Sequence, residues 1–277
     1  MNTASLKDKF EAMGARLKVG ELRPRRWQRM NDAVSFTVDI KEDKRGEFFE
    51  LLVRPDAVPD LQILDLQPAD RHLLLLSKEV RDPKRGRNGV DLSRFLCGHD
   101  ERQWFVAAVP GSASSVREAM EALKPEVVRD SQARHKVKTK RRNKRKNDGF
   151  VRQGEWFFVP CPDMEVDEKL VLKDEPLRRG RGKPHMAEFL FRRGGTTVRV
   201  CRQYPNGLTE GEYARLVRED PAKAKLNWQT MSRDPEAFVK GKIRHSDHKT
   251  VELPFWHRVV PNAETQSQAG QRVAFLD

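Results

Sequence analysis

Three histidines, His245, His248 and His257, lie within thirteen residues in the last part of the chain. An imidazole titrates near neutral pH, so it can donate or accept the protons that phosphodiester cleavage requires. Asp247 separates the first two, and neighbouring arginine and lysine side chains could stabilise the negative charge that develops in the reaction. This composition indicates a nuclease-like site whose catalytic groups are the three histidines and Asp247.

The same cluster has a metal-binding interpretation. His245 and His248 stand three residues apart, and Cys161, His185 and Cys201 are further possible ligands. We expect an extended backbone here, on which positions three apart face opposite sides of a sheet and converge only in a turn. The sequence therefore does not favour a metal site, and it does not indicate which cofactor, if any, the protein binds.

A structural interpretation explains the cluster equally well. In it, residues 245–248 form a polar hairpin turn in which Asp247 bonds to the backbone, and His257 packs beside Trp256. The test that separates this from catalysis is whether His185, His245, His248 and His257 meet in one cleft of the folded chain.

Most of the positive charge lies in one segment. Residues 129–148 carry ten basic and two acidic residues, whereas residues 1–128 carry 22 and 21 and residues 149–277 carry 22 and 18. Such a concentration of charge attracts phosphate and releases counterions on binding, without reading a base sequence. We therefore expect this segment to bind DNA or RNA through Lys136, Lys138, Lys140, Arg141, Arg142, Lys144, Arg145 and Lys146.

Two smaller basic groups could assist. The first group consists of Arg178, Arg179, Arg181 and Lys183. We expect it to be a surface loop or a hook that enters the DNA minor groove, although Gly182 stands where such a hook would have proline. Trp27 lies among four arginines in residues 23–29 and could stack on a base. Two other interpretations explain the positive charge of residues 129–148: a localisation signal, or an assembly factor that binds an acidic protein partner. The sequence leaves the oligomeric state open.

The elements that must position these residues are mainly strands. Alternating apolar residues predict antiparallel hairpins over 33–110, and helical spacing predicts helices over 6–17, 114–123 and 209–218. Residues 187–191 and 196–201 are predicted to pair as a tight hairpin, because two glycines separate them. Short strands are predicted at 240–244, 248–253 and 256–260.

The predicted fold class is α+β, with two antiparallel β-rich domains that each contain one or two helices. We place them at residues 1–128 and 149–277, joined by a basic linker or solvated helix at 129–148. The sequence has no apolar run long enough to suggest a membrane protein. Its three widely spaced cysteines fit a reducing compartment. We expect a cytoplasmic protein, or a nuclear one in a eukaryotic host.

Overall fold

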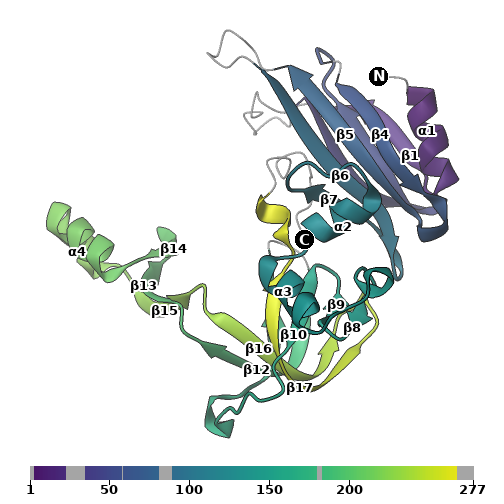
Figure 1. The fold of residues 1–277 in the computed structure, drawn as a ribbon. Coiled ribbons are helices and arrows are strands. Elements are labelled where there is room, and N and C mark those ends of the chain that lie inside the picture. The colour runs from purple at the N-terminus through teal and green to yellow at the C-terminus, as the bar shows by residue number, and fades with distance from the viewer. Residues whose placement is uncertain (1–2, 23–34, 58, 81–88, 180–182, 267–277) are drawn as a thin grey trace.

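A computed structural model describes residues 3–22, 35–57, 59–80, 89–179 and 183–266 (Figure 1). Within these ranges the chain is mostly β-sheet with four α-helices, and all strand pairs except one are antiparallel. The predicted α+β class is confirmed. No helix in the described ranges is both long and apolar enough to cross a membrane.

The first part of the chain stacks two sheets face to face. One has the strand order β1-β3-β2, in which β1 runs parallel to β3, and the other has the order β4-β5-β6-β7. Phe36, Phe49 and Phe95 are fully buried between them, together with Phe10 from helix α1 (Thr3–Ala12). The strands are β1 (Leu17–Glu21), β2 (Phe36–Asp43), β3 (Gly46–Val53), β4 (Asp60–Gln67), β5 (His72–Val80), β6 (Val90–Asp100) and β7 (Gln103–Val109).

Helix α2 (Val116–Ala122) covers the outer face of the second sheet, where its Val116 and Ala119 pack against Leu74 and Leu96. The Ser115 side chain caps the helix by accepting a hydrogen bond from the Glu118 amide, and the helix lies within the predicted range 114–123. The hairpins expected in 33–110 are likewise present as β2–β3, β4–β5 and β6–β7.

The basic segment is folded rather than extended. It contains most of helix α3 (Glu126–Arg134), a short 3₁₀ turn (Thr139–Arg141) and strand β8 (Lys146–Asn147). Ser131 and Gln132 are fully buried, and Val137 is buried as well. The expectation of a linker or solvated helix is therefore corrected: one side of the segment is part of the protein interior.

The second large sheet has the strand order β11-β12-β16-β17-β10-β9-β8. Its other strands are β9 (Phe150–Gln153), β10 (Trp156–Pro160), β11 (Leu172–Leu177), β12 (His185–Arg193), β16 (Glu236–Arg244) and β17 (Val251–Pro261). The sheet curls around Phe158, Leu190 and Val239. Because of this curl, the side-chain amide of Gln153 in β9 donates to the carbonyl of Ile243 in β16 and to the carbonyl of Lys249 in the loop between β16 and β17.

An arm projects from this sheet (Figure 1). It consists of β13 (Thr196–Cys201), β14 (Tyr204–Leu208), helix α4 (Glu210–Glu219) and β15 (Gln229–Arg233), with strand order β14-β13-β15. Helix α4 begins with the Thr209–Glu212 capping box, consistent with the predicted helix. The predicted hairpin of 187–191 with 196–201 is wrong, because β12 pairs with β16 and β13 pairs with β15.

The two halves of the chain contact each other. The Ala263 amide donates to the Leu123 carbonyl, and the Glu264 carboxylate accepts a hydrogen bond from the Ala108 amide, so the end of the chain returns to the first half. Four 3₁₀ turns complete the described fold at Pro68–Asp70, Glu168–Leu170, Pro221–Lys225 and Ala263–Gln266. The division into two domains stays a prediction.

Candidate metal centre beside an internal cavity

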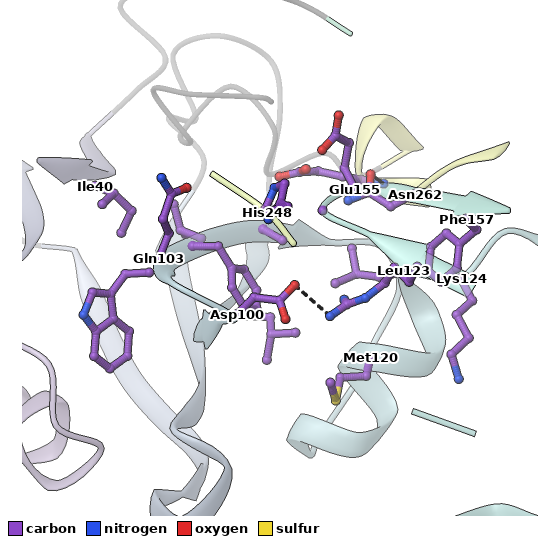
Figure 2. A pocket seen from close by; sticks show the side chains of 18 of the residues that line it. Ile40, Asp100, Gln103, Met120, Leu123, Lys124, Glu155, Phe157, His248 and Asn262 are labelled. Carbon is purple, nitrogen blue, oxygen red and sulfur yellow. Dashed lines mark hydrogen bonds and ion pairs between the residues drawn. The ribbon is translucent and has the colours of Figure 1, made fainter. Parts of the chain in front are cut away.

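A cavity of about 320 Å³ lies between the first half and the curled sheet (Figure 2). Its lining includes apolar side chains such as Met120, Leu123 and Phe157, together with several charged groups. His248 and the β9–β10 turn, Gly154 and Glu155, also line it. The cavity therefore extends to the loop that carries two of the predicted site histidines.

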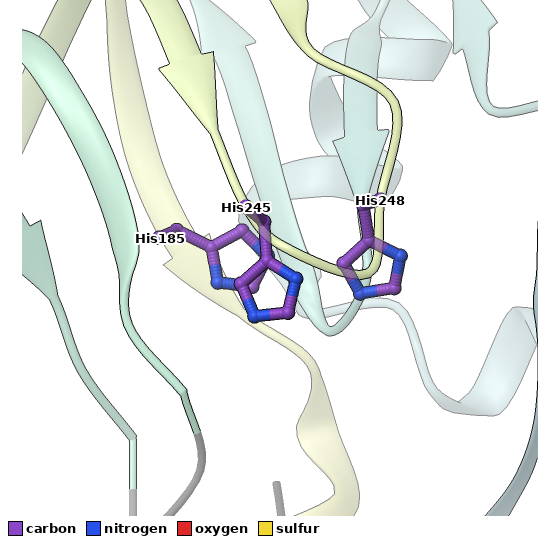
Figure 3. A group of neighbouring side chains, drawn as sticks. All are labelled: His185, His245 and His248. Carbon is purple, nitrogen blue, oxygen red and sulfur yellow. The ribbon is translucent and has the colours of Figure 1, made fainter.

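Three histidines meet at this end of the cavity (Figure 3). The β12–β16 register pairs Met186 with Arg244, which brings His185, the first residue of β12, next to His245. Their rings stack with centroids 4.2 Å apart. His248, in the loop before β17, lies 4.7 Å from the His245 ring and 5.5 Å from the His185 ring.

The spacing of the ring nitrogens suits a metal ion. One nitrogen from each histidine lies within 4.8 Å of the others. A tetrahedral zinc ion binds imidazole nitrogens at about 2.0–2.1 Å, which places them about 3.4 Å apart. The ring nitrogens therefore need to approach one another by at most about 1.4 Å. Residues 245–250 are a loop rather than the expected extended strand, which is why His245 and His248 face the same point.

Burial keeps two of the imidazoles, those of His185 and His248, neutral. His185 is only 2% exposed, and neither of its ring nitrogens has a hydrogen-bond partner in the described chain; the same is true of His248 Nδ1. Burial, reinforced by the neighbouring imidazoles, lowers the pKa of His185 to about 3 and that of His248 to about 4. A neutral imidazole is the form that binds a metal ion, so no proton must leave either ring at neutral pH.

Gly154 leaves space for an occupant. Its φ of +58° is a left-handed conformation that glycine adopts readily. A Cβ atom here would lie 2.9 Å from His248 Nε2 and 3.3 Å from His185 Nε2. The two Nε2 atoms therefore face the same small space, and a side chain at position 154 would crowd it.

Carboxylates lie behind two of the rings. Glu101 Oε2 is 3.6 Å from His248 Nδ1 and accepts a hydrogen bond from the Lys249 amide, while Arg145 forms an ion pair with the same carboxylate. Glu155 Oε1 lies 4.0 Å from His185 Nδ1. Carboxylates in such positions orient metal-binding histidines and leave Nε2 directed at the ion.

His245 is held more loosely. Its Nδ1 accepts a hydrogen bond from the Asp247 amide at 3.2 Å, and its Nε2 lies 3.3 Å from the Lys183 carbonyl. The Asp247 carboxylate pairs with the exposed Lys183 ammonium at 3.0 Å. Binding an ion through His245 therefore exchanges one long hydrogen bond for a metal–ligand bond.

His257 does not join the cluster. It lies within β17, is 3% exposed, donates from Nδ1 to the Phe255 carbonyl at 2.8 Å and stacks on the Phe255 ring. Burial lowers its pKa. The structure thus places His257 apart from the other predicted site histidines, and it packs on Phe255 rather than on the expected neighbour Trp256. Cys161 and Cys201 also lie outside the group of three.

The predicted phosphate-binding cations are divided between two roles. Arg142 pairs with Glu121, and Arg145 pairs with Asp100 and Glu101, so both help to hold the fold. Arg179 is partly buried and donates to Asn262, and Arg178 is exposed. Arg181 and Trp27 lie outside the described residues. Of the eight cations predicted in the segment, those that are exposed are Lys136, Lys138, Lys140, Arg141, Lys144 and Lys146.

Several residues of this site escaped the sequence analysis. Gly154 and Glu155 look like an ordinary turn between two strands, and Asp100 with Glu101 looks like a polar turn between β6 and β7. The only indication in the sequence was the set of four histidines that includes His185. Whether they converge could not be decided from their spacing along the chain. No family model, curated protein or solved structure matches this chain.

Proposed function

We propose that this protein is a metal-dependent hydrolase whose ion is held by His185, His245 and His248. The observation that carries the proposal is the convergence of three imidazoles, two of them held neutral by burial, at the end of a cavity. Structural zinc sites have four protein ligands, whereas catalytic sites have three and leave a position for water or substrate. The three-histidine set therefore supports a catalytic site.

The chemistry that such an ion supplies is activation of water near neutral pH and polarisation of the bond to be broken. The chain's own residues would bind and orient the ion. His185 and His248 enter as neutral ligands, Glu101 and Glu155 hold their rings, and the cavity admits a substrate next to His248. The histidine pattern of the sequence predicts phosphodiester cleavage by His245, His248, His257 and Asp247 without favouring a metal. The present proposal keeps hydrolysis and two of these histidines, and it takes His185 as the third ligand.

Metal loading tests the proposal. After chelation and reloading, we expect the protein to hold about one zinc ion per chain, and a cobalt-substituted sample to show the visible absorption of tetrahedral coordination. His185→Ala and His248→Ala should each weaken zinc binding by about 100-fold or more. His257→Gln, which removes a histidine outside the cluster, should retain the ion. The measurement is a competition titration with a chelator, with circular dichroism to confirm folding.

Two results would contradict this function differently. If His185→Ala binds zinc as tightly as the original protein, the three histidines do not form a metal site. If zinc binds but chromogenic esters, amides, phosphomonoesters and phosphodiesters all stay intact, the metal site stands and hydrolysis does not.

Nucleic-acid binding is a second candidate function, and a specific observation favours it. Lys136, Lys138, Lys140, Lys144 and Lys146 are exposed and form no ion pair with any described residue. They are spread over the outer side of a segment whose inner side is buried, so their backbone is fixed in place. A fixed group of unpaired cations favours a polyanion such as DNA or RNA.

Exchanging these five lysines for glutamine tests the second candidate. We expect weaker binding to DNA and RNA, and a slope of log K against log salt that becomes shallower by about 0.9 for each phosphate that is no longer neutralised. The matched control replaces Lys7, Lys9, Lys169, Lys173 and Lys225, which are exposed elsewhere, and makes the same change in net charge. Equal salt slopes for both variants would show that only the total charge matters.

A further inference from the structure

Strand β7 has one free edge, and the cavity runs along it. The strand order β4-β5-β6-β7 leaves β7 paired with β6 only, within the described chain. Four consecutive residues of β7 line the cavity: Trp104, Phe105, Val106 and Ala107. Successive side chains of a strand point to opposite faces of the sheet, so a space that is lined by four in a row lies beside the strand edge.

The hydrogen bonds of β7 show which backbone groups face this space. The Trp104 amide donates to the Glu47 carboxylate at 2.8 Å. The Ala108 amide donates to the Glu264 carboxylate, also at 2.8 Å, so both amides point away from β6. The β6–β7 register has no shift, so the backbone of Val106, midway between them, points the same way. Its amide and carbonyl form no hydrogen bond with any other described residue, which leaves them open to the cavity.

An open strand edge of this kind can take up a further strand. A backbone amide or carbonyl that is shielded from water costs free energy unless it is hydrogen-bonded, and Val106 is half-buried. In an antiparallel pair, one residue of the added strand exchanges two hydrogen bonds with the residue opposite. The Val106 backbone therefore fits one residue of an extended peptide.

Apolar side chains flank this edge on both faces of the sheet. Phe105 and Met120 lie on the face that helix α2 covers, and Trp104 and Ile40 lie on the face towards β2 and β3. All four line the cavity. An added strand directs alternate side chains to the two faces, and pockets for alternate side chains give edge-binding sites their specificity. The lining therefore suits a peptide with apolar side chains.

The histidine cluster lies at the end of the cavity where β7 begins. The strand begins two residues after Glu101, whose carboxylate is 3.6 Å from His248 Nδ1. Gln103, the first residue of β7, lines the cavity together with His248 (Figure 2). Val106 is three residues further along, a distance of about 10 Å in a strand. A peptide of about three or four residues therefore extends from Val106 to the histidines.

We propose that the substrates of this site are short apolar peptides, which bind as an added strand on the free edge of β7 and present an amide bond to His185, His245 and His248. The proposal rests on the hydrolase function above and names its substrate class. Antiparallel pairing directs the peptide towards the histidines from its N-terminal to its C-terminal side. In the reaction the amide C–N bond breaks, and water supplies the hydroxyl of the new carboxyl group and the proton of the new amine.

A peptide with a zinc-binding end tests this arrangement. The probe is acetyl-Ala-Leu-Phe hydroxamate, whose hydroxamate stands in place of the amide to be cleaved, and the reference is acetohydroxamate, which has no peptide. Calorimetry on the zinc-loaded protein should show the peptide probe binding about 100-fold tighter. Methylation of the probe amide that donates to the Val106 carbonyl should cost about tenfold, whereas methylation of an amide that points away from β7 should cost much less.

Two variants of one residue assign the effect to the strand edge. Val106→Pro removes the amide that faces the cavity and takes no hydrogen bond from the β6–β7 ladder. Val106→Ala shortens the same side chain but keeps the amide, so it is the matched control. We expect the proline variant to bind the peptide probe about tenfold more weakly than the alanine variant, with equal affinities for acetohydroxamate and zinc. Circular dichroism checks folding, and the methylated probes on the original protein decide the question if the proline variant does not fold.

The outcomes separate this inference from the hydrolase function. Equal binding of the peptide probe and acetohydroxamate to the zinc-loaded protein would overturn the peptide site while the metal site stands. A tight probe that tolerates methylation at every amide would overturn the pairing with β7. A bound probe with intact acetyl-Ala-Leu-Phe p-nitroanilide would overturn the substrate role. If no hydroxamate binds, but the metal-free protein binds acetyl-Ala-Leu-Phe amide with one methylation-sensitive position, the peptide site stands and the metal-dependent function does not.

Discussion

At the scale of single residues, His185 has the least ordinary environment. A buried polar group without a hydrogen-bond partner costs about 1–3 kcal/mol, and both ring nitrogens of His185 are in this position. A metal ion would give one nitrogen a partner, and the Glu155 carboxylate lies nearest the other. The cluster is therefore less stable empty than filled.

The carboxylate behind His248 should set the affinity for the ion. Glu101→Gln keeps an acceptor for the Lys249 amide but removes the negative charge next to His248 Nδ1, so we expect zinc affinity to fall about tenfold. Asp100→Asn is the control, because it also removes a carboxylate from Arg145 without touching His248. Chelator competition measures both, and equal losses would mean that the Arg145 ion pairs matter rather than the orientation of His248.

Residue types alone predicted part of this site. His245 and His248 were identified because they are close in sequence, and proximity along the chain survives folding. His185 is sixty residues earlier and reaches them only through the β12–β16 register, which no local pattern encodes. His257 lies apart from the cluster because β17 turns its side chain into the interior, and the pairing of β17 with β10 and β16 decides that orientation.

At the scale of elements, the arm is an insertion into a hairpin. Arg193 at the end of β12 pairs with Glu236 at the start of β16, and the ladder resumes beyond it with Thr196 opposite Arg233. β12–β13 and β15–β16 therefore run as one kinked ribbon. Gly195 lies at the kink with φ +86°, and a Cβ there would meet Ser232 Oγ at 2.4 Å.

This geometry explains the failed hairpin prediction. Two adjacent glycines with positive φ suit a tight turn and a kink equally well, so the local sequence could not separate them. The other hairpins were predictable because their partners are adjacent in the chain. The partner of β12 lies beyond the whole arm, and such long-range pairing depends on tertiary packing.

The arm should be dispensable for folding and for the metal site. Its strands pair only with one another, and Val198, Tyr204 and Trp228 pack within it. We expect a variant in which Asn-Gly replaces residues 194–235, joining Arg193 to Glu236, to fold and to bind zinc with unchanged affinity. Circular dichroism and zinc titration check this; loss of either fold or zinc would show that the arm supports the sheet.

At the scale of the whole molecule, the basic segment connects the two halves of the chain through ion pairs that its arginines form. Arg145 bridges to Asp100 and Glu101 in the first half, while Gln132 and Asn147 of the segment itself are buried. Composition predicted the positive charge correctly but not this burial, because the two apolar residues it contains seemed too few to anchor it. Polar side chains that bond to backbone provide the rest, as Ser131 does to the Gly149 carbonyl.

Stability of the metal-free protein should fall as the pH falls below about 6.5. Burial lowers the pKa of His72 and His257, and lowers that of His185 to about 3 and His248 to about 4. In the unfolded chain these histidines have a pKa near 6.5, so below that pH the unfolded state binds protons that the folded state does not bind. The stabilisation that the neutral buried histidines contribute is therefore fully present above about pH 6.5. It is lost as the pH falls from there towards their pKa values in the folded state.

Urea unfolding in the presence of a chelator measures this effect. The unfolding free energy should drop between pH 7 and pH 5, by at most about 1.4 kcal/mol per pH unit for each buried histidine. His257→Gln should make the dependence shallower, because one such group is removed. A flat profile over this range would mean that the buried histidines carry their protons in the folded state.

The kinked ribbon connects the histidine cluster to the arm. His185 is the first residue of β12 and His245 directly follows the last residue of β16, while the arm is attached to the opposite ends of the same two strands. Each strand has nine residues and spans about 30 Å. The two histidines and the arm therefore lie at opposite ends of one pair of strands, which continues from the ligand cluster through the curled sheet into the arm.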